Sequence, residues 1–156
     1  NIEDVRKFIA YSQQNPNTIV SGAPQFAADA PKARVYGRKV TDFWVALETL
    51  SLNFKDSLCG FRIYPLNHFK QVTDKFSLGN RMDFDTEVLV KSVWLGAQVH
   101  FIPTNVRYIE NNVSHFHYLN DNLSLIYLHV RLMLGMLIRS PKLLFWRLTG
   151  RSATRK

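Results

Sequence analysis

Three carboxylates lie within five residues of the sequence, in the order Asp83-Phe84-Asp85-Thr86-Glu87. An enzyme that transfers a glycosyl, acyl or phosphoryl group needs one carboxylate to take the proton from the acceptor hydroxyl. If this cluster begins a helix, Asp83 and Glu87 share one face and Asp85 points elsewhere, because residues four apart are neighbours on a helix. Acidic residues at a helix N-terminus also stabilise the helix dipole without any catalytic role. Spacing alone leaves both interpretations open.

A second candidate is the pair Asp56 and Arg62, which flanks a turn at Gly60. An arginine binds phosphate oxygens through two parallel hydrogen bonds, so a carboxylate and a guanidinium here suit a pocket for a phosphorylated ligand. The alternative is an ion pair that only holds the turn together.

Metal ligation and thiol chemistry have less support in the sequence. His115 and His117, with Asp121 four residues on, carry metal-ligating side chains, but in an extended loop the two histidines point in opposite directions. We therefore predict no metal site in this chain. Cys59 has no neighbouring histidine in the sequence to activate it as a nucleophile. As the single cysteine it cannot form an internal disulfide, which favours a reducing compartment.

Helical and extended segments must hold these residues in place. Apolar residues at helical spacing predict helices, and short β-branched runs predict strands. The predicted helices are 2–14 (capped by Asn1), 40–54, 83–95 (ended by Gly96) and 121 or 122 to 139 (ended by Ser140-Pro141). The predicted strands are 18–20, 61–64 and 99–102 (ended by Pro103), with loops at 23–33 and 109–120. This order predicts an α/β fold whose few strands indicate an excerpt of a longer domain.

Composition excludes a disordered chain, because 46% of the 156 residues are hydrophobic and 13% aromatic. The most apolar stretch, 123–138, contains His129 and Arg131 and falls short of an uninterrupted membrane span. The net charge is +8, but residues 1–138 carry 14 basic and 12 acidic residues. Residues 139–156 carry six basic residues and no acidic one. The basic character therefore belongs to the C-terminal tail.

The basic tail adjoins a segment rich in leucine, phenylalanine and tryptophan, which favours contact with an anionic membrane surface through residues 139–156. Proteins that bind nucleic acid usually carry basic residues across a docking face, so we predict no nucleic-acid partner. The alternative for the tail is solvated charge without a function. The alternative for the preceding helix is that its apolar stripe packs on the domain core.

Several segments together resemble family 2 glycosyltransferases, in particular the branch that makes dolichyl- or polyprenyl-phosphate sugars. Residues 56–62 resemble the family's D-x-x-x-G-F-R segment, and residues 84–103 resemble its F-D-x-E-[LV] … G … v-x-x-I-P block. Residues 111–116 resemble G-x-S-K-[FL], with His115 in place of the usual lysine and no glycine in the first position. Residues 1–23 resemble the helix and the [VI]-[VI]-x-G-[SA] strand that follow the family's D-A-D-G-Q-H motif. The resemblance covers about residues 1–120.

The resemblance implies roles for individual residues. Asp85 overlays the E-D-x-D motif in which many relatives place the general base, so it would deprotonate an acceptor hydroxyl. If the acceptor is a lipid phosphate, which is already ionised, Asp85 would act electrostatically. Asp56 would position the sugar or Arg62, and Arg62 would contact phosphate. The other implied phosphate- or substrate-binding residues are Arg38, Glu87 and Ser114.

The resemblance also implies a GT-A fold, of which this chain would be the C-terminal, acceptor-side half over residues 1–119, followed by an amphipathic helix and basic tail over 120–156. The nucleotide-binding strands and the D-x-D motif that holds Mg²⁺ or Mn²⁺ would lie before Asn1, so the chain alone would be inactive. The implied partners are a nucleotide-sugar donor and a lipid-linked or cell-envelope acceptor, at the cytoplasmic face of the inner membrane. The alternative is a non-catalytic basic α/β module that binds an anionic membrane or nucleic acid. The coding sequence upstream of Asn1 would discriminate between them.

Overall fold

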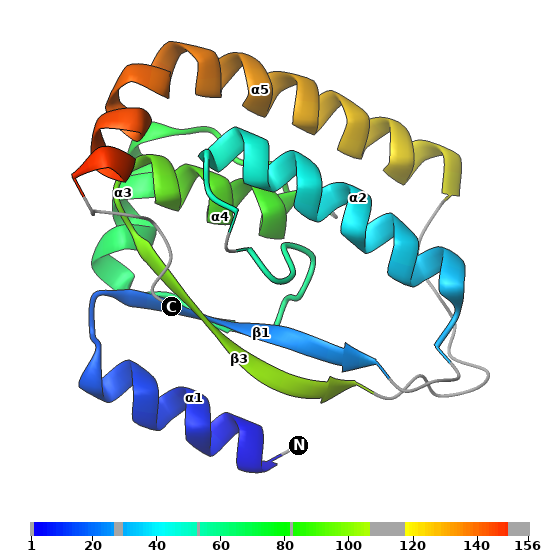
Figure 1. Cartoon of the computed structure of the whole chain (residues 1–156), viewed down its shortest axis with the longest axis vertical. Helices are drawn as coiled ribbons and strands as arrows, with labels where there is room; N and C mark the ends of the chain where they lie inside the picture. The colour runs from blue at the N-terminus through cyan, green and yellow to red at the C-terminus, as the bar shows by residue number, and fades with distance from the viewer. Residues whose placement is uncertain (1, 27–29, 53, 82, 107–117, 150–156) are drawn as a thin grey trace.

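The computed structural model describes residues 2–26, 30–52, 54–81, 83–106 and 118–149. In chain order the elements are α1 (Ile2–Gln14), β1 (Thr18–Phe26), α2 (Lys32–Thr49), β2 (Arg62–Ile63), α3 (Leu66–Lys75), α4 (Phe84–Trp94), β3 (Gln98–Val106) and α5 (Tyr118–Leu148). The described strands form one sheet in the order β2-β1-β3, with β1 antiparallel to β2 and parallel to β3. Helix α1 covers one face of this sheet, and α2, α4 and α5 lie on the other (Figure 1). The predicted α/β class is confirmed.

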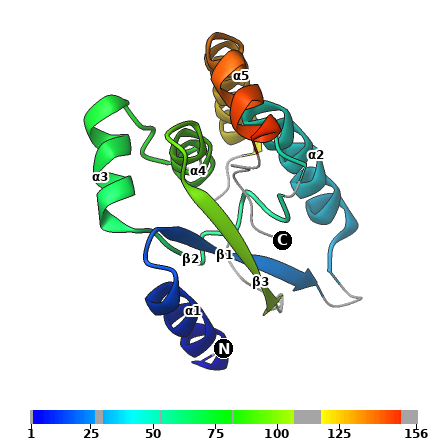
Figure 2. The same cartoon turned by 60° about the vertical axis from the view of Figure 1, so that its left-hand side comes forward.

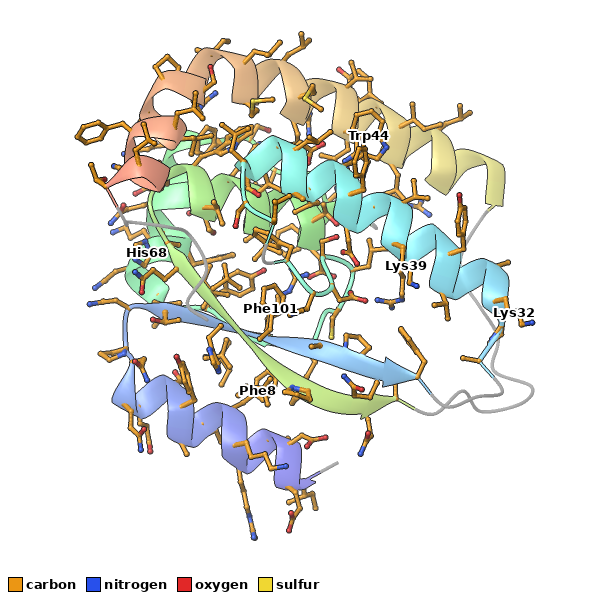
Figure 3. The ribbon with its side chains drawn as sticks, viewed as in Figure 1. Phe8, Lys32, Lys39, Trp44, His68 and Phe101 are labelled. Atoms are coloured by element: carbon orange, nitrogen blue, oxygen red, sulfur yellow. The ribbon has the colours of Figure 1, made fainter. Side chains whose placement is uncertain are left out.

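The main core lies between the sheet and the helices α2, α4 and α5. Helix α4 is buried at every residue from Thr86 to Trp94, because most of these residues are apolar and the buried Glu87 and Lys91 pair with each other. Figure 2 shows α3 beside α4, and these two helices are in contact. Phe101 of β3 lies on the core side of the sheet, whereas Phe8 lies between α1 and the opposite face (Figure 3), where its ring packs on Phe61 with centroids 4.3 Å apart.

Both long strands extend beyond their predicted ends. β1 and β3 stay in parallel register from Thr18 opposite Gln98 to Phe26 opposite Val106, so the prolines at 24 and 103 do not end them. A strand tolerates proline where one of its edges has no hydrogen-bonded neighbour. Within the described sheet, β3 is an edge strand and β1 pairs with β2 only at residues 20 and 21. Each proline nitrogen, which has no N–H to donate, can therefore face the side of its strand that has no hydrogen-bonded neighbour.

Both predicted ends of α2 are wrong, and one further helix, α3, was not predicted. Helix α2 begins after Pro31 rather than at residue 40, and it ends where Leu50 adopts a left-handed backbone conformation. Helix α3 was not predicted: Leu66, Phe69 and Val72 recur at helical spacing, but the helix has only ten residues, most of them polar, and only Val72 is buried. Gly96, with a φ of +96°, follows α4 as predicted. The predicted loop at 109–120 lies outside the described residues as far as residue 117, and it is wrong for residues 118–120, which form the start of α5.

The predicted break at Ser140-Pro141 is also wrong, since α5 continues through Pro141 to Leu148. A proline inside a helix removes the hydrogen bond to the carbonyl four residues earlier, which here is that of Leu137. The Ser140 hydroxyl donates to this Leu137 carbonyl at 2.9 Å, so the freed acceptor has a partner. Because α5 continues, Leu143 joins Leu128, Leu132 and Met136 in the main core.

Substitution by alanine should have opposite effects on stability at two glycines that lie inside helices. A Cβ on Gly135 in α5 would lie 2.6 Å from the indole ring of buried Trp94, whose Nε1 donates to the Glu48 carbonyl at 2.8 Å. Gly135→Ala should therefore lower the free energy of unfolding by about 1–3 kcal/mol, because overpacking exceeds the gain in helix propensity. A Cβ on Gly37 in α2 would meet nothing within 4 Å. As the matched control, Gly37→Ala should raise stability by about 0.5–1 kcal/mol. Urea unfolding measures both, and two changes of the same sign would contradict the tight contact at Trp94.

Candidate functional site

Helix α2 holds the loop that contains Asp56. Nη1 of Arg38 donates to both carboxylate oxygens of Asp56, at 2.7 and 2.8 Å, and the buried Asp56 also accepts from the backbone N–H of Leu58 at 2.9 Å. One turn further along α2, Asp42 accepts from the backbone N–H and the hydroxyl of Ser57, at 2.7 and 2.8 Å. The sequence left open a phosphate pocket or an ion pair between Asp56 and Arg62, but the ion-pair partner of Asp56 is Arg38 of α2.

Arg62 joins three parts of the fold through its guanidinium. Its Nε donates to the hydroxyl of Ser21 in β1 at 3.1 Å, and its Nη2 donates to the carbonyl of Ser57 at 2.6 Å. Its Nη1 donates to the hydroxyl of Tyr64 at 3.0 Å and to the backbone carbonyl of Asp85 at 2.6 Å. These bonds use four of the five N–H donors that an arginine carries. Arg62 therefore fixes the loop and the first turn of α4 against the sheet.

Asp85 lies in the first turn of α4, with its carboxylate beside Gly60. A Cβ built on Gly60 would lie 3.4 Å from Oδ2 of Asp85, so the glycine leaves space in front of this carboxylate. Asp85 is half-buried, and within the described part of the chain no group donates a hydrogen bond to its carboxylate. A carboxylate in this state is able to accept a proton or a hydrogen bond from a ligand.

The other two acidic residues of the cluster face a different loop. A Cβ on Gly79 would lie 2.0 Å from the Asp83 carboxylate, and the Gly79 N–H donates to Oε2 of Glu87 at 2.6 Å. Asp83 also accepts from the Arg81 N–H at 3.2 Å. Asp83 and Glu87 thus share one helix face and Asp85 lies on another, as their spacing predicts.

Glu87 is fully buried and is held by cations. Its Oε1 accepts from Nζ of Lys91 at 2.6 Å and from Nη2 of Arg131, and Lys91 donates in addition to the Ser77 carbonyl at 2.8 Å. Buried carboxylates need such partners, because desolvation otherwise penalises the charge. This arrangement ties the loop before α4 and helix α5 to α4, and it leaves Glu87 no exposed surface for a substrate.

Burial also raises the pKa of three groups around the loop. Desolvation raises the pKa of the Tyr64 phenol, despite the opposing effect of the neighbouring Arg62. Desolvation likewise raises the pKa of the Asp42 carboxyl and of the Cys59 thiol. The Cys59 sulfur packs so closely on β1 that a Cβ on Gly22 would lie 2.9 Å from it. A buried thiol with a raised pKa is a poor nucleophile, in agreement with the sequence prediction for Cys59.

The structure thus brings Arg38, Asp56, Arg62 and Asp85 to one loop and places Glu87 elsewhere. Ser114, His115 and His117 lie outside the described residues, as does the side chain of Asp121. Among the described residues, no group of three or more His, Cys, Asp or Glu side chains could hold a metal ion. Three residues that position the loop were not predicted from the sequence: Ser21, Asp42 and Ser57. The only signal for Asp42 was its position one helical turn after Arg38.

Comparisons of the chain with protein-family models, with curated proteins and with solved structures found no match.

Proposed function

We propose that this chain is the acceptor-side part of an inverting, family-2-like glycosyltransferase, which transfers a sugar from a nucleotide-sugar donor to a lipid-linked or cell-envelope acceptor. The observation that carries the proposal is the carboxylate of Asp85. It lies beside Gly60 with no described partner, while Arg62 holds the backbone of the same residue at 2.6 Å. A rigid backbone with a free carboxylate is what a general base requires.

With a hydroxyl acceptor, Asp85 takes the hydroxyl proton while the acceptor oxygen forms its bond to the anomeric carbon. The bond from that carbon to the nucleoside diphosphate breaks on the opposite side, so the configuration inverts and the diphosphate leaves with the electron pair. With a lipid phosphate acceptor no proton is transferred, because the attacking oxygen is already ionised. Asp85 then orients the acceptor electrostatically.

The geometry favours Arg38 over Arg62 as the phosphate ligand. Arg62 has four donors engaged by protein acceptors, so we assign it a positioning role. Arg38 uses only Nη1, its side chain is 26% exposed, and its Nε and Nη2 donate to no described residue. An arginine anchored at one nitrogen and open at the others can bind a phosphate at a fixed position. Arg38 is therefore the proposed phosphate ligand, with Asp56 as its anchor.

The proposal implies Mg²⁺ or Mn²⁺ at the donor diphosphate. Among the described residues, no group of three or more His, Cys, Asp or Glu side chains could hold such an ion. The D-x-D sequence that the chain does contain, Asp83-Phe84-Asp85, lies in the segment to which the general base is assigned. The ion would therefore be held by residues other than those discussed, and no step of the transfer is derived through it.

Helix α5 is long and apolar enough, between Leu123 and Trp146, to associate with a membrane by length and composition. We propose a peripheral location at the cytoplasmic face of the inner membrane, where lipid-linked acceptors are found. Within the predicted basic tail, Lys142 is exposed, but Arg139 stacks on Trp94 and Phe76 with its Cζ 4.6 and 5.4 Å from the ring centroids. Arg139 therefore serves the core rather than the lipid.

Binding of a short polyprenyl monophosphate to the 156-residue chain tests the acceptor-side assignment. With the ¹⁵N-labelled chain and geranyl phosphate as the probe, we expect saturable shifts of the amide signals of Gly60 and Asp85. Geraniol, which lacks the phosphate, should cause none of them, and Arg38→Met should weaken the binding. Shifts confined to α5, or none at all, would overturn the assignment and favour the non-catalytic membrane-binding module.

A further inference from the structure

Helix α5 has an apolar outer face along its whole described length. The residues of this face recur at helical spacing and are exposed: Leu123, Tyr127, Val130, Leu134, Leu137, Ile138, Phe145 and Leu148. Ile138 is 80% exposed and Leu134 60%. A contiguous exposed apolar surface of this length marks an interaction site rather than a solvated face.

The inner face of α5 is tied to the domain by polar contacts as well as by apolar packing. Nδ1 of His129 lies 2.7 Å from Oε1 of the fully buried Glu48 in α2. Two residues further along α5, Arg131 donates to the fully buried Glu87 in α4. Insertion of α5 into the bilayer would break both contacts and carry the His129 and Arg131 side chains into hydrocarbon without their carboxylate partners, at a large desolvation cost. Helix α5 is therefore a fixed part of the domain.

Helix α2 extends the same outer surface. Its exposed apolar residues lie on one helical stripe, Tyr36, Val40, Phe43 and Trp44. Trp44 lies at the contact between α2 and α5 (Figure 3), with its ring centroid 6.4 Å from that of His129. We refer to these four residues and the eight of α5 as the α2–α5 face.

The charges on these two helices favour an anionic partner. Lys32 and Lys39 of α2 and Lys142 of α5 are exposed. Between residues 123 and 149 the sequence contains no acidic residue. The two acidic residues of α2 are turned inward, because Asp42 accepts from Ser57 and Glu48 pairs with His129. Basic residues around an apolar face are typical of helices that lie in the interface of an anionic bilayer.

We propose that the α2–α5 face lies flat in the interfacial layer of an anionic membrane, and that α5 does not span the bilayer although its length and composition would allow it. The inference rests on the membrane association proposed above but not on sugar transfer. Spanning would require α5 to leave Glu48 and Glu87, whereas lying flat buries the exposed residues and keeps both contacts.

Vesicle flotation of the purified 156-residue chain tests the surface. We expect the chain to float with vesicles that contain phosphatidylglycerol, less so at high salt, and weakly with phosphatidylcholine alone. Leu134→Glu in α5 and Phe43→Glu in α2 should each lower the partition coefficient about tenfold. Ile2→Glu is the matched control, since Ile2 is exposed on α1 across the sheet, and it should float like the wild type. Equal flotation of all three variants would overturn the proposal.

Labelling of the two ends of α5 tests the orientation. In a Cys59→Ala background, Leu123→Cys and Leu148→Cys place a thiol at either end of the exposed stripe. A membrane-impermeant maleimide outside the vesicles should react with both variants to a similar, reduced extent if α5 lies flat, because both ends then lie in the outer interface. Protection of one end alone would show that α5 spans.

Light scattering of the free chain tests the alternative that the α2–α5 face binds a second copy of the same chain. A dimer that Leu134→Glu dissociates, with no vesicle binding, would overturn the membrane assignment.

Discussion

Replacement of Asp85 by asparagine should lower sugar transfer to a hydroxyl acceptor, by the product of the complete gene, roughly 10²- to 10⁴-fold. Asparagine keeps the shape of the side chain but cannot take the acceptor proton. The contacts that position this turn of α4 involve the Asp85 backbone carbonyl and Arg62, so the substitution leaves them intact. Initial rates at saturating donor and acceptor measure the effect, which should fall on kcat. With a lipid phosphate acceptor the loss should be smaller, because no proton is transferred.

Asp83→Asn is the matched control for this experiment. It makes the same chemical change two residues earlier, but the Asp83 carboxylate lies against Gly79 rather than Gly60. We expect Asp83→Asn to transfer sugar at close to the wild-type rate. If both variants lost activity to the same extent, general electrostatics at the helix N-terminus would explain the effect, and the assignment of Asp85 as the base would be wrong.

Removal of the buried carboxylate of Glu87 should have the largest effect on stability. Glu87→Ala is expected to lower the free energy of unfolding by about 3–5 kcal/mol, because it leaves the buried Lys91 ammonium without its counter-charge. The variant also removes the acceptor of the Gly79 N–H and of Arg131. Urea unfolding followed by circular dichroism measures the change.

Two further variants separate charge from packing at this site. Glu87→Gln keeps the size and an acceptor oxygen, so it should lose less stability than Glu87→Ala. Asp74→Ala removes an exposed carboxylate on α3 and should change stability by no more than about 0.5 kcal/mol. If Glu87→Ala cost no more than Asp74→Ala, the buried ion cluster would contribute nothing to the fold.

The elements that the sequence predicted correctly are those with a strong local signal. Helix α4 combines an acidic first turn, a mainly apolar body and a glycine after its end, and all three signals indicate the same helix. Helix α3 lacks these signals: it has no acidic residue in its first turn, most of its ten residues are polar, and only Val72 is buried. The break predicted at Pro141 failed because a side chain, the Ser140 hydroxyl, replaces the missing backbone donor.

At the candidate site, the sequence identified most of the residues but not how they pair. Asp56, Arg62 and Asp85 are all at the loop, yet the partner of Asp56 is Arg38, 18 residues earlier in the chain. Arg62 makes bonds across 41 residues to Ser21 and across 23 residues to Asp85. Such pairs depend on how α2 and α4 pack on the sheet, which no local spacing specifies. The motif locates the loop, and tertiary packing decides which arginine remains open to a ligand.

Transfer of labelled sugar tests the central claim most directly. The product of the complete gene is incubated with Mg²⁺, radiolabelled nucleotide sugars and a lipid extract of bacterial membranes, and label in the organic phase is counted. We predict that at least one nucleotide sugar gives extractable labelled lipid, and that Asp85→Asn and chelation of the metal each reduce it. If the folded protein transferred label from none of the common nucleotide sugars to lipid or to envelope glycan, the glycosyltransferase assignment would be contradicted.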